Sequence, residues 1–151
     1  MKQIKKMNTS QFIFFFLLLI VGSHAENQIL ELNTNNKEVL KVSATLNTVL
    51  DVRVKGNPTT GFNWFVENAN ELNDAKVLTP LNLNDKNASK DYVTNTNTNG
   101  AFGVGGFYSF QFLPSNEGNA LIKLSYKRPW LKSSGQTYTL DVTVEKQLED
   151  D

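Results

Sequence analysis

Two adjacent hydroxyl side chains, Thr59 and Thr60, occur in a short segment whose ends restrict the backbone. Pro58 fixes its own φ and favours an extended conformation at Asn57, whereas Gly61 can adopt a positive φ. Alternating apolar residues predict a strand on each side: Leu50, Val52 and Val54 before the turn, and Phe62, Trp64 and Val66 after it. Because Pro and Gly also mark ordinary turns, this pattern alone predicts either a binding loop or a plain connection.

The first 25 residues have the three parts of a secretory signal peptide. These parts are a basic start from Lys2 to Lys6, an apolar run over residues 12–21, and the small residues of Ser23-His24-Ala25. We therefore expect residues 26–151 to form one domain that enters the secretory pathway and reaches an extracellular, lysosomal or other vesicular lumen. The alternative is an uncleaved signal anchor, although the run is short for a membrane span.

Residues 26–151 contain neither histidine nor cysteine, because the only histidine is His24 and the sequence has no cysteine. This composition excludes Ser-His-Asp and Cys-His nucleophilic sites, the usual zinc sites and disulfide bonds. We expect no enzymatic activity, no cofactor and no metal site. A core of packed apolar side chains must then hold the domain together without covalent links.

The charge balance of residues 26–151 argues against a nucleic-acid partner. Three of the fifteen basic residues and none of the fifteen acidic ones lie in residues 1–25, so twelve basic against fifteen acidic residues leave a net charge of −3. Lys127, Arg128 and Lys132 cluster, but three cations without a wider basic surface do not indicate phosphate binding. Their segment is predicted to be a solvated or partner-facing loop.

Apolar residues alternate with period two through most of residues 26–151, and no stretch shows a helical repeat. The predicted strands cover residues 29–32, 39–43, 48–55 and 62–67, followed by three long strands centred on Phe110, Ile122 and Leu140. Trp64 is predicted to anchor the core. The sequence therefore predicts an all-β, immunoglobulin-like β-sandwich of about seven or eight strands without a disulfide, with a barrel as the alternative.

The segment over residues 68–100 is rich in Asn, Asp, Lys and Thr and is predicted to connect strands. Its apolar pieces at residues 77–78, 81–83 and 92–93 are candidate edge strands, and residues 94–100 are predicted to form an exposed mobile loop. Asn87-Ala88-Ser89 makes Asn87 a glycosylation candidate, whereas Pro58 blocks the sequon at Asn57.

Three glycines occur directly before a predicted strand, in Gly103-Val104-Gly105-Gly106-Phe107. Glycines let a backbone approach closely, but their spacing here is not that of a P-loop or a dinucleotide fingerprint, and no helix is predicted to follow. We therefore do not expect a nucleotide. The segment is predicted to be either a binding loop or a flexible entry into the strand.

The segment Arg128-Pro129-Trp130 follows a long predicted strand that ends at Tyr126. Pro129 cannot donate to a strand ladder and favours an extended Arg128, so Trp130 is predicted to lie in a loop. Trp and Arg are enriched at binding hot spots, which indicates a contact surface. The alternative is that Trp130 folds back onto the sandwich.

Together, these three segments resemble the motifs of the chagasin family. The members of this family are secreted immunoglobulin-like inhibitors of papain-like cysteine peptidases. The matching residues, in the family's order and with suitable spacing, are Asn57-Pro58-Thr59-Thr60-Gly61-Phe62 with Trp64, Gly103-Val104-Gly105-Gly106-Phe107, and Tyr126-Lys127-Arg128-Pro129-Trp130. The Asn-rich middle and the acidic tail match nothing in the family. We call residues 57–61 the first loop, 103–107 the second loop and 128–130 the third loop.

The resemblance implies a monomer that inhibits papain-like, cathepsin L-like cysteine peptidases by reversible, competitive and non-covalent binding. The three loops would lie at one end of the sandwich as a wedge, with Thr59 and Thr60 entering the cleft beside the catalytic cysteine. The second and third loops would clasp the cleft from either side, and Trp130 would pack on an aromatic surface of the enzyme. The alternative from another class is a secreted adhesion or ligand-binding module with no peptidase inhibition.

Overall fold

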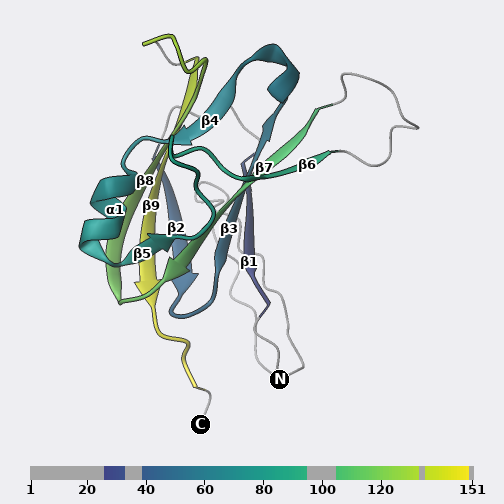
Figure 1. Cartoon of the computed structure of the whole chain (residues 1–151). Coiled ribbons are helices and arrows are strands. Elements are labelled where there is room, and N and C mark those ends of the chain that lie inside the picture. Colours follow the sequence, from purple (N-terminus) through teal and green to yellow (C-terminus); the bar gives the residue numbers. More distant parts are fainter. Residues whose placement is uncertain (1–25, 33–38, 95–104, 133–134, 150–151) are drawn as a thin grey trace.

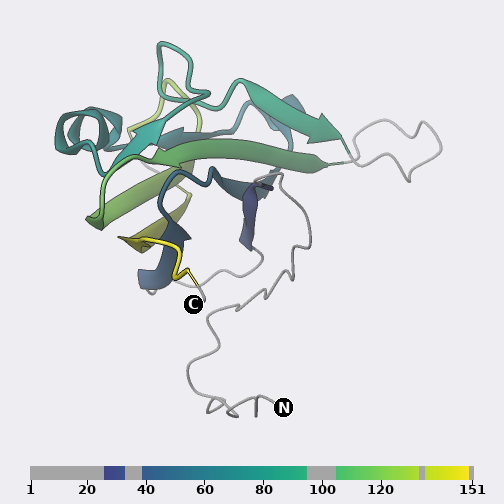
Figure 2. The same ribbon diagram turned by 90° about the horizontal axis from the view of Figure 1, so that it is seen from below.

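Two β-sheets packed face to face form the molecule, as Figures 1 and 2 show. The computed structural model describes residues 26–32, 39–94, 105–132 and 135–149. The predicted signal peptide, residues 95–100 of the predicted mobile loop, and Gly103 and Val104 of the second loop lie outside the described residues. The prediction of an all-β, immunoglobulin-like sandwich without a disulfide is confirmed.

The two sheets contain five and four strands. Sheet A has the order β1 (Gln28–Leu32), β3 (Leu50–Gly56), β7 (Gly106–Pro114) and β5 (Leu78–Pro80), with β6 (Asp91–Thr94) also paired to β7. Sheet B has the order β2 (Val39–Thr45), β9 (Gln136–Glu145), β8 (Gly118–Lys127) and β4 (Asn63–Val66). The β1–β3 and β2–β9 pairs are parallel, and the other pairs are antiparallel. The β3–β4 and β8–β9 connections consequently lie at the same end of the sandwich (Figure 1).

Trp64 lies in the core, as the sequence predicted. Its side chain is buried, its Nε1 donates to the Lys55 carbonyl oxygen at 2.9 Å, and its ring lies 5.0 Å from that of Tyr126 and 5.4 Å from that of Tyr138, measured between centroids. The predicted inward faces of the long strands are buried in the same core, namely Tyr108, Phe110, Phe112, Ile122, Leu124, Tyr138, Leu140, Val142 and Val144. Trp64 thus joins the two sheets directly beneath the β3–β4 connection.

Lys127 covers the opposite face of β4. Its Nζ lies 5.4 Å from the centroid of the buried Phe65 ring and 2.6 Å from Glu67 Oε1. Burial alone would raise the pKa of the Glu67 carboxyl, but hydrogen bonds from Lys127 and Ser125 outweigh burial and lower this pKa below its usual range. The result is a charged pair on the outer surface of sheet B.

The Asn-rich segment contains more regular structure than the sequence predicted. A helix, α1 (Ala69–Ala75), forms where none was expected, because seven residues with only Ala69 and Leu72 buried are too few to show a helical repeat. Strands β5 and β6 confirm the edge strands expected at 77–78 and 92–93, whereas residues 81–83 contribute only an isolated bridge from Leu83. The described residues therefore contain nine strands instead of seven or eight. None of their helices is long and apolar enough to cross a membrane.

We predict that Trp64→Ala lowers the free energy of unfolding by about 3 to 5 kcal/mol, because it leaves a large cavity between the sheets. Urea unfolding followed by circular dichroism measures this loss. The matched control is Trp130→Ala, which removes an exposed indole and should cost less than about 1 kcal/mol. Equal losses in the two variants would contradict the assignment of Trp64 to the core and Trp130 to the surface.

Candidate functional site

The first loop is a 3-10 turn whose conformation follows from its Pro and Gly. Asn57 is extended, with φ −134° and ψ 107°, and Gly61 has a positive φ of 78°, so both predicted conformations are confirmed. The amides of Thr60 and Gly61 donate to the carbonyl oxygens of Asn57 and Pro58 at 3.3 and 3.2 Å. The turn is therefore closed by its own backbone.

Asn57 also binds the hydroxyl groups of both threonines. Thr59 Oγ1 donates to Asn57 Oδ1 at 2.6 Å, and Thr60 Oγ1 donates to the Asn57 carbonyl oxygen at 2.8 Å. The Thr59 amide adds a third hydrogen bond to Asn57 Oδ1, at 3.0 Å. Because a hydroxyl has one proton and two lone pairs, the exposed threonines offer a partner acceptor oxygens and methyl groups, while their protons hold the turn.

The third loop lies directly against the first. A Cβ atom on Gly61 would be 3.3 Å from Trp130 Cη2 and 4.0 Å from Arg128 Nε. Trp130 is nevertheless 69% exposed, and the Leu131 amide closes its turn by donating to the Arg128 carbonyl oxygen at 3.0 Å. Trp130 therefore lies in a loop, as predicted. One edge of its indole packs on the first loop, and the indole does not fold back onto the sandwich.

Phe62 connects the bases of these two loops. Its ring stacks on Tyr126 with centroids 5.1 Å apart, and the guanidinium carbon of Arg128 lies 4.8 Å from the centroid of the Phe62 ring. The sequence motifs predicted Phe62 and Arg128 as separate residues that contact a peptidase, and they did not predict that Phe62 and Arg128 contact each other. The exposed Leu131, which follows Trp130, was not predicted as part of the site. It could have been found from the sequence as an apolar residue that lies outside the alternating pattern of the strands.

The described part of the second loop meets the first loop at its base. Gly106 is buried at the start of β7, where a Cβ atom would be 2.0 Å from the Val93 carbonyl oxygen. The close backbone approach expected at these glycines is therefore made by β6 of the same chain. Gly106 also pairs with Gly56, the residue before the first loop, so the start of the first loop lies beside the end of the second.

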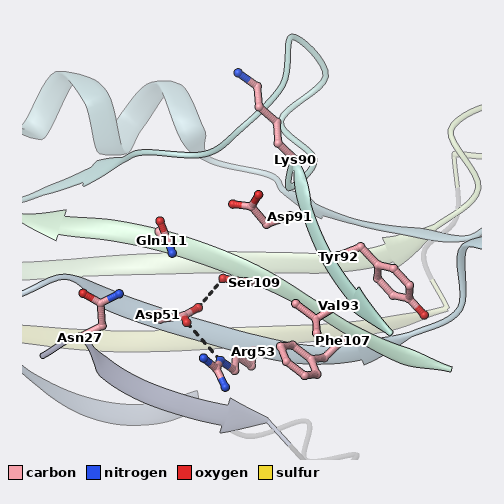
Figure 3. Close-up of a pocket in the computed structure, with 10 residues that line it drawn as sticks. All are labelled: Asn27, Asp51, Arg53, Lys90, Asp91, Tyr92, Val93, Phe107, Ser109 and Gln111. Carbon is pink, nitrogen blue, oxygen red and sulfur yellow. Dashed lines mark hydrogen bonds and ion pairs between the residues drawn. The ribbon is translucent and has the colours of Figure 1, made fainter. Parts of the chain in front are cut away.

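Phe107 is separated from the first and third loops. Its ring lies on the outer face of sheet A, with the Arg53 guanidinium carbon 5.0 Å from its centroid. It lines a shallow hollow whose floor contains the buried Asp51, which accepts hydrogen bonds from Ser109 Oγ at 2.6 Å and Arg53 Nε at 3.1 Å (Figure 3). No residue of the first or third loop lines this hollow. The structure therefore brings together the first loop, the third loop and the base of the second, but not Phe107.

Burial affects the ionisation of Tyr108, whose ring lies against Gly56 just before the first loop. Burial and the neighbouring Tyr126 and Tyr92 raise the pKa of Tyr108 to about 12, so its hydroxyl stays protonated and donates to Asn63 Oδ1 at 2.7 Å. Within the described ranges, no group of His, Cys, Asp and Glu side chains could hold a metal ion.

The glycosylation candidate Asn87 lies in a turn beside the edge strand β4. Its carbonyl oxygen accepts a hydrogen bond from the Val66 amide at 2.9 Å, and its φ is 62°. The sequon hydroxyl, Ser89 Oγ, donates to the Ser109 carbonyl oxygen and accepts from the Asp91 amide at 3.0 Å. Asn87 is half-buried in this arrangement, and its modification stays a prediction.

The described residues thus form a β-sandwich that carries a stiff turn and an exposed tryptophan at one end. Residues 43–144 match the family model described as Chagasin family peptidase inhibitor I42, and the chain therefore belongs to this family. The members of this family are peptidase inhibitors and not enzymes.

Relatives and solved structures agree with this assignment. The chain is 28% identical to Amoebiasin-1 of Entamoeba histolytica over 112 residues, which cover 74% of this chain and 94% of that protein. The solution structure of Amebosin is 26% identical with a TM-score of 0.55, covering 79% of this chain and 98% of Amebosin. The crystal structure of the cysteine protease inhibitor EhICP2 from Entamoeba histolytica, 20% identical with a TM-score of 0.55, covers 82% of this chain and all of that one and shares the fold.

Proposed function

We propose that the protein is a reversible, competitive, non-covalent inhibitor of papain-like cysteine peptidases, including cathepsin L-like enzymes. The observation that carries this proposal is the contact of Trp130 with Gly61, which combines the first and third loops into one exposed tip. In the proposed complex the first loop enters the cleft, with Thr59 nearest the catalytic cysteine. Trp130 packs on an aromatic surface beside the cleft, and the second loop contacts its other side.

Stiff loops make such an inhibitor possible without a reactive group. A specific interface buries about 800 Å² on each partner, an area that three adjacent loops can supply. Binding is weakened by whatever freedom the loops lose, and this loss is small when the turn is already closed by its own hydrogen bonds. The proposal also includes a monomeric inhibitor, since one copy carries all three loops.

The shape of the first loop supports its use as an inhibitor that is not a substrate. The carbonyl oxygens of Asn57 and Pro58 already accept hydrogen bonds from Thr60 and Gly61 within the turn. Their orientation is thus fixed by the turn and not by the peptidase. A peptidase would have to open the turn before it could position either carbonyl for attack.

The first test is a titration of residues 26–151 against papain and a cathepsin L-like enzyme. We expect inhibition that a higher substrate concentration relieves, and Trp130→Ala should weaken it by roughly 2 to 4 kcal/mol, or about 30- to 700-fold in Ki. Lys146→Ala is the control and should leave Ki unchanged, because Lys146 directly follows the end of β9 that lies opposite the loops. Full peptidase activity at micromolar inhibitor would instead favour the adhesion or ligand-binding module.

The second test concerns cleavage of the first loop. We predict that the chain stays intact between Asn57 and Phe62 during prolonged incubation with excess active papain-like peptidase, because the turn holds its carbonyls in hydrogen bonds. Mass spectrometry of the recovered inhibitor, with residual inhibition measured in parallel, gives the result. Clipping within this segment together with fading inhibition would show that the loop is a slow substrate.

The third test concerns the compartment. We propose that the chain enters the secretory pathway and acts in an extracellular or vesicular lumen, on the basis of its first 25 residues. Expression of the full sequence in eukaryotic cells should release a protein that begins at Glu26, and its mass will show whether Asn87 carries a glycan. Retention of an unprocessed chain in the membrane fraction would support the signal anchor.

A further inference from the structure

The side chain of Arg128 is packed against its own protein and does not extend freely into solvent. Its guanidinium lies over the Phe62 ring, and its Nε, 4.0 Å from the position of a Cβ on Gly61, is inaccessible to solvent. This Nε has no hydrogen-bond partner among the described residues. A peptidase cannot reach a buried nitrogen, so this part of Arg128 serves the inhibitor itself.

The neighbours of Arg128 belong to both loops of the exposed tip. Phe62 follows the first loop directly and stacks on Tyr126 at the end of β8, while the edge of the Trp130 indole lies across Gly61. Arg128 is in the third loop and contacts the Phe62 ring from there. A planar guanidinium stacks on an aromatic face, which a lysine ammonium cannot do in the same way.

We propose that Arg128 is a positioning residue that fixes the first loop to the third through Phe62, so that the two loops dock as one rigid body. The inference rests on the proposed function for its effect on inhibition, but the packing it describes belongs to the free protein. Trp130, not Arg128, then supplies the direct contact of the third loop. Removal of the guanidinium plane should loosen the placement of the first loop relative to Trp130 and weaken inhibition without unfolding the sandwich.

The first part of the test uses the free protein and NMR spectroscopy. The Gly61 Hα protons lie beside the Trp130 indole, so their ring-current shift reports how the loops are joined. We expect Trp130→Ala to abolish this shift and Arg128→Met to reduce it. Lys127→Met is the matched control, since it removes the preceding cation, which lies over Phe65 on the other face, and it should leave the Gly61 shift unchanged. An unchanged Gly61 shift in Arg128→Met would overturn the proposal.

The second part measures Ki for Arg128→Met, Phe62→Leu and the double variant, with thermal melts to confirm folding. If Arg128 acts through Phe62, each single variant loses about tenfold and the double variant loses about the same, because the two changes remove one shared interaction. Arg128→Lys should then be as weak as Arg128→Met. Multiplied losses near a hundredfold, or full inhibition by Arg128→Lys, would show a direct charge contact and overturn the proposal.

The two parts separate failure of this inference from failure of the proposed function. If the unmodified protein inhibits no papain-like peptidase, the proposed function is wrong, and the Gly61 shift still decides whether Arg128 positions the first loop. If the protein inhibits a papain-like peptidase but the Gly61 chemical shift is the same in Arg128→Met, the positioning role of Arg128 is wrong and the proposed function stands.

Discussion

The indole of Trp64 connects the ends of four strands just beneath the exposed tip. Its Nε1 is hydrogen-bonded to Lys55 near the end of β3, and its ring packs on Tyr126 of β8 and Tyr138 of β9. These are the strands that lead into and out of the first and third loops. Because Trp64 is buried, its position cannot vary without opening the core. The loops therefore start from strand ends whose positions Trp64 fixes.

Two glycines extend this constraint to the second loop. Gly56 has no room for a Cβ, which would lie 2.6 Å from Tyr108 Cε2, and its pairing partner Gly106 is enclosed by the backbone of β6. A side chain at Gly56 would meet the Tyr108 ring, and one at Gly106 would meet the backbone of β6. What reads in the sequence as a flexible, glycine-rich segment is, at Gly106, a tightly packed strand end. Glycine is therefore needed at position 106 because there is no space for a side chain, and not because the backbone must move.

The sequence predicted those features that depend on local chemistry. Alternation identified the long strands, and Pro58 and Gly61 determined the first turn, because each of these effects acts within a few residues. Helix α1 was missed because only two of its seven residues are buried, which is too few to show a helical period. The packing of Gly106 against β6 was missed because β6 lies more than ten residues earlier in the chain. The contact of Arg128 with Phe62 likewise joins residues 66 positions apart. Such contacts arise only when the sandwich brings two strand ends together.

The polar groups of the exposed tip are used mainly inside it. Asn57 binds the hydroxyl protons of Thr59 and Thr60, and Arg128 Nε is buried against the first loop. A partner therefore meets acceptor oxygens, threonine methyl groups and most of the Trp130 indole on a surface whose shape is already set. New hydrogen bonds from the threonine protons to a partner would first require those within the turn to break, so they would add little affinity. Because the turn is already ordered, it loses little entropy on docking. In the proposed complex, selectivity would depend on how well a cleft fits the fixed distance between the turn and the indole, so the contact between the two loops would matter as much as the residues at their tips.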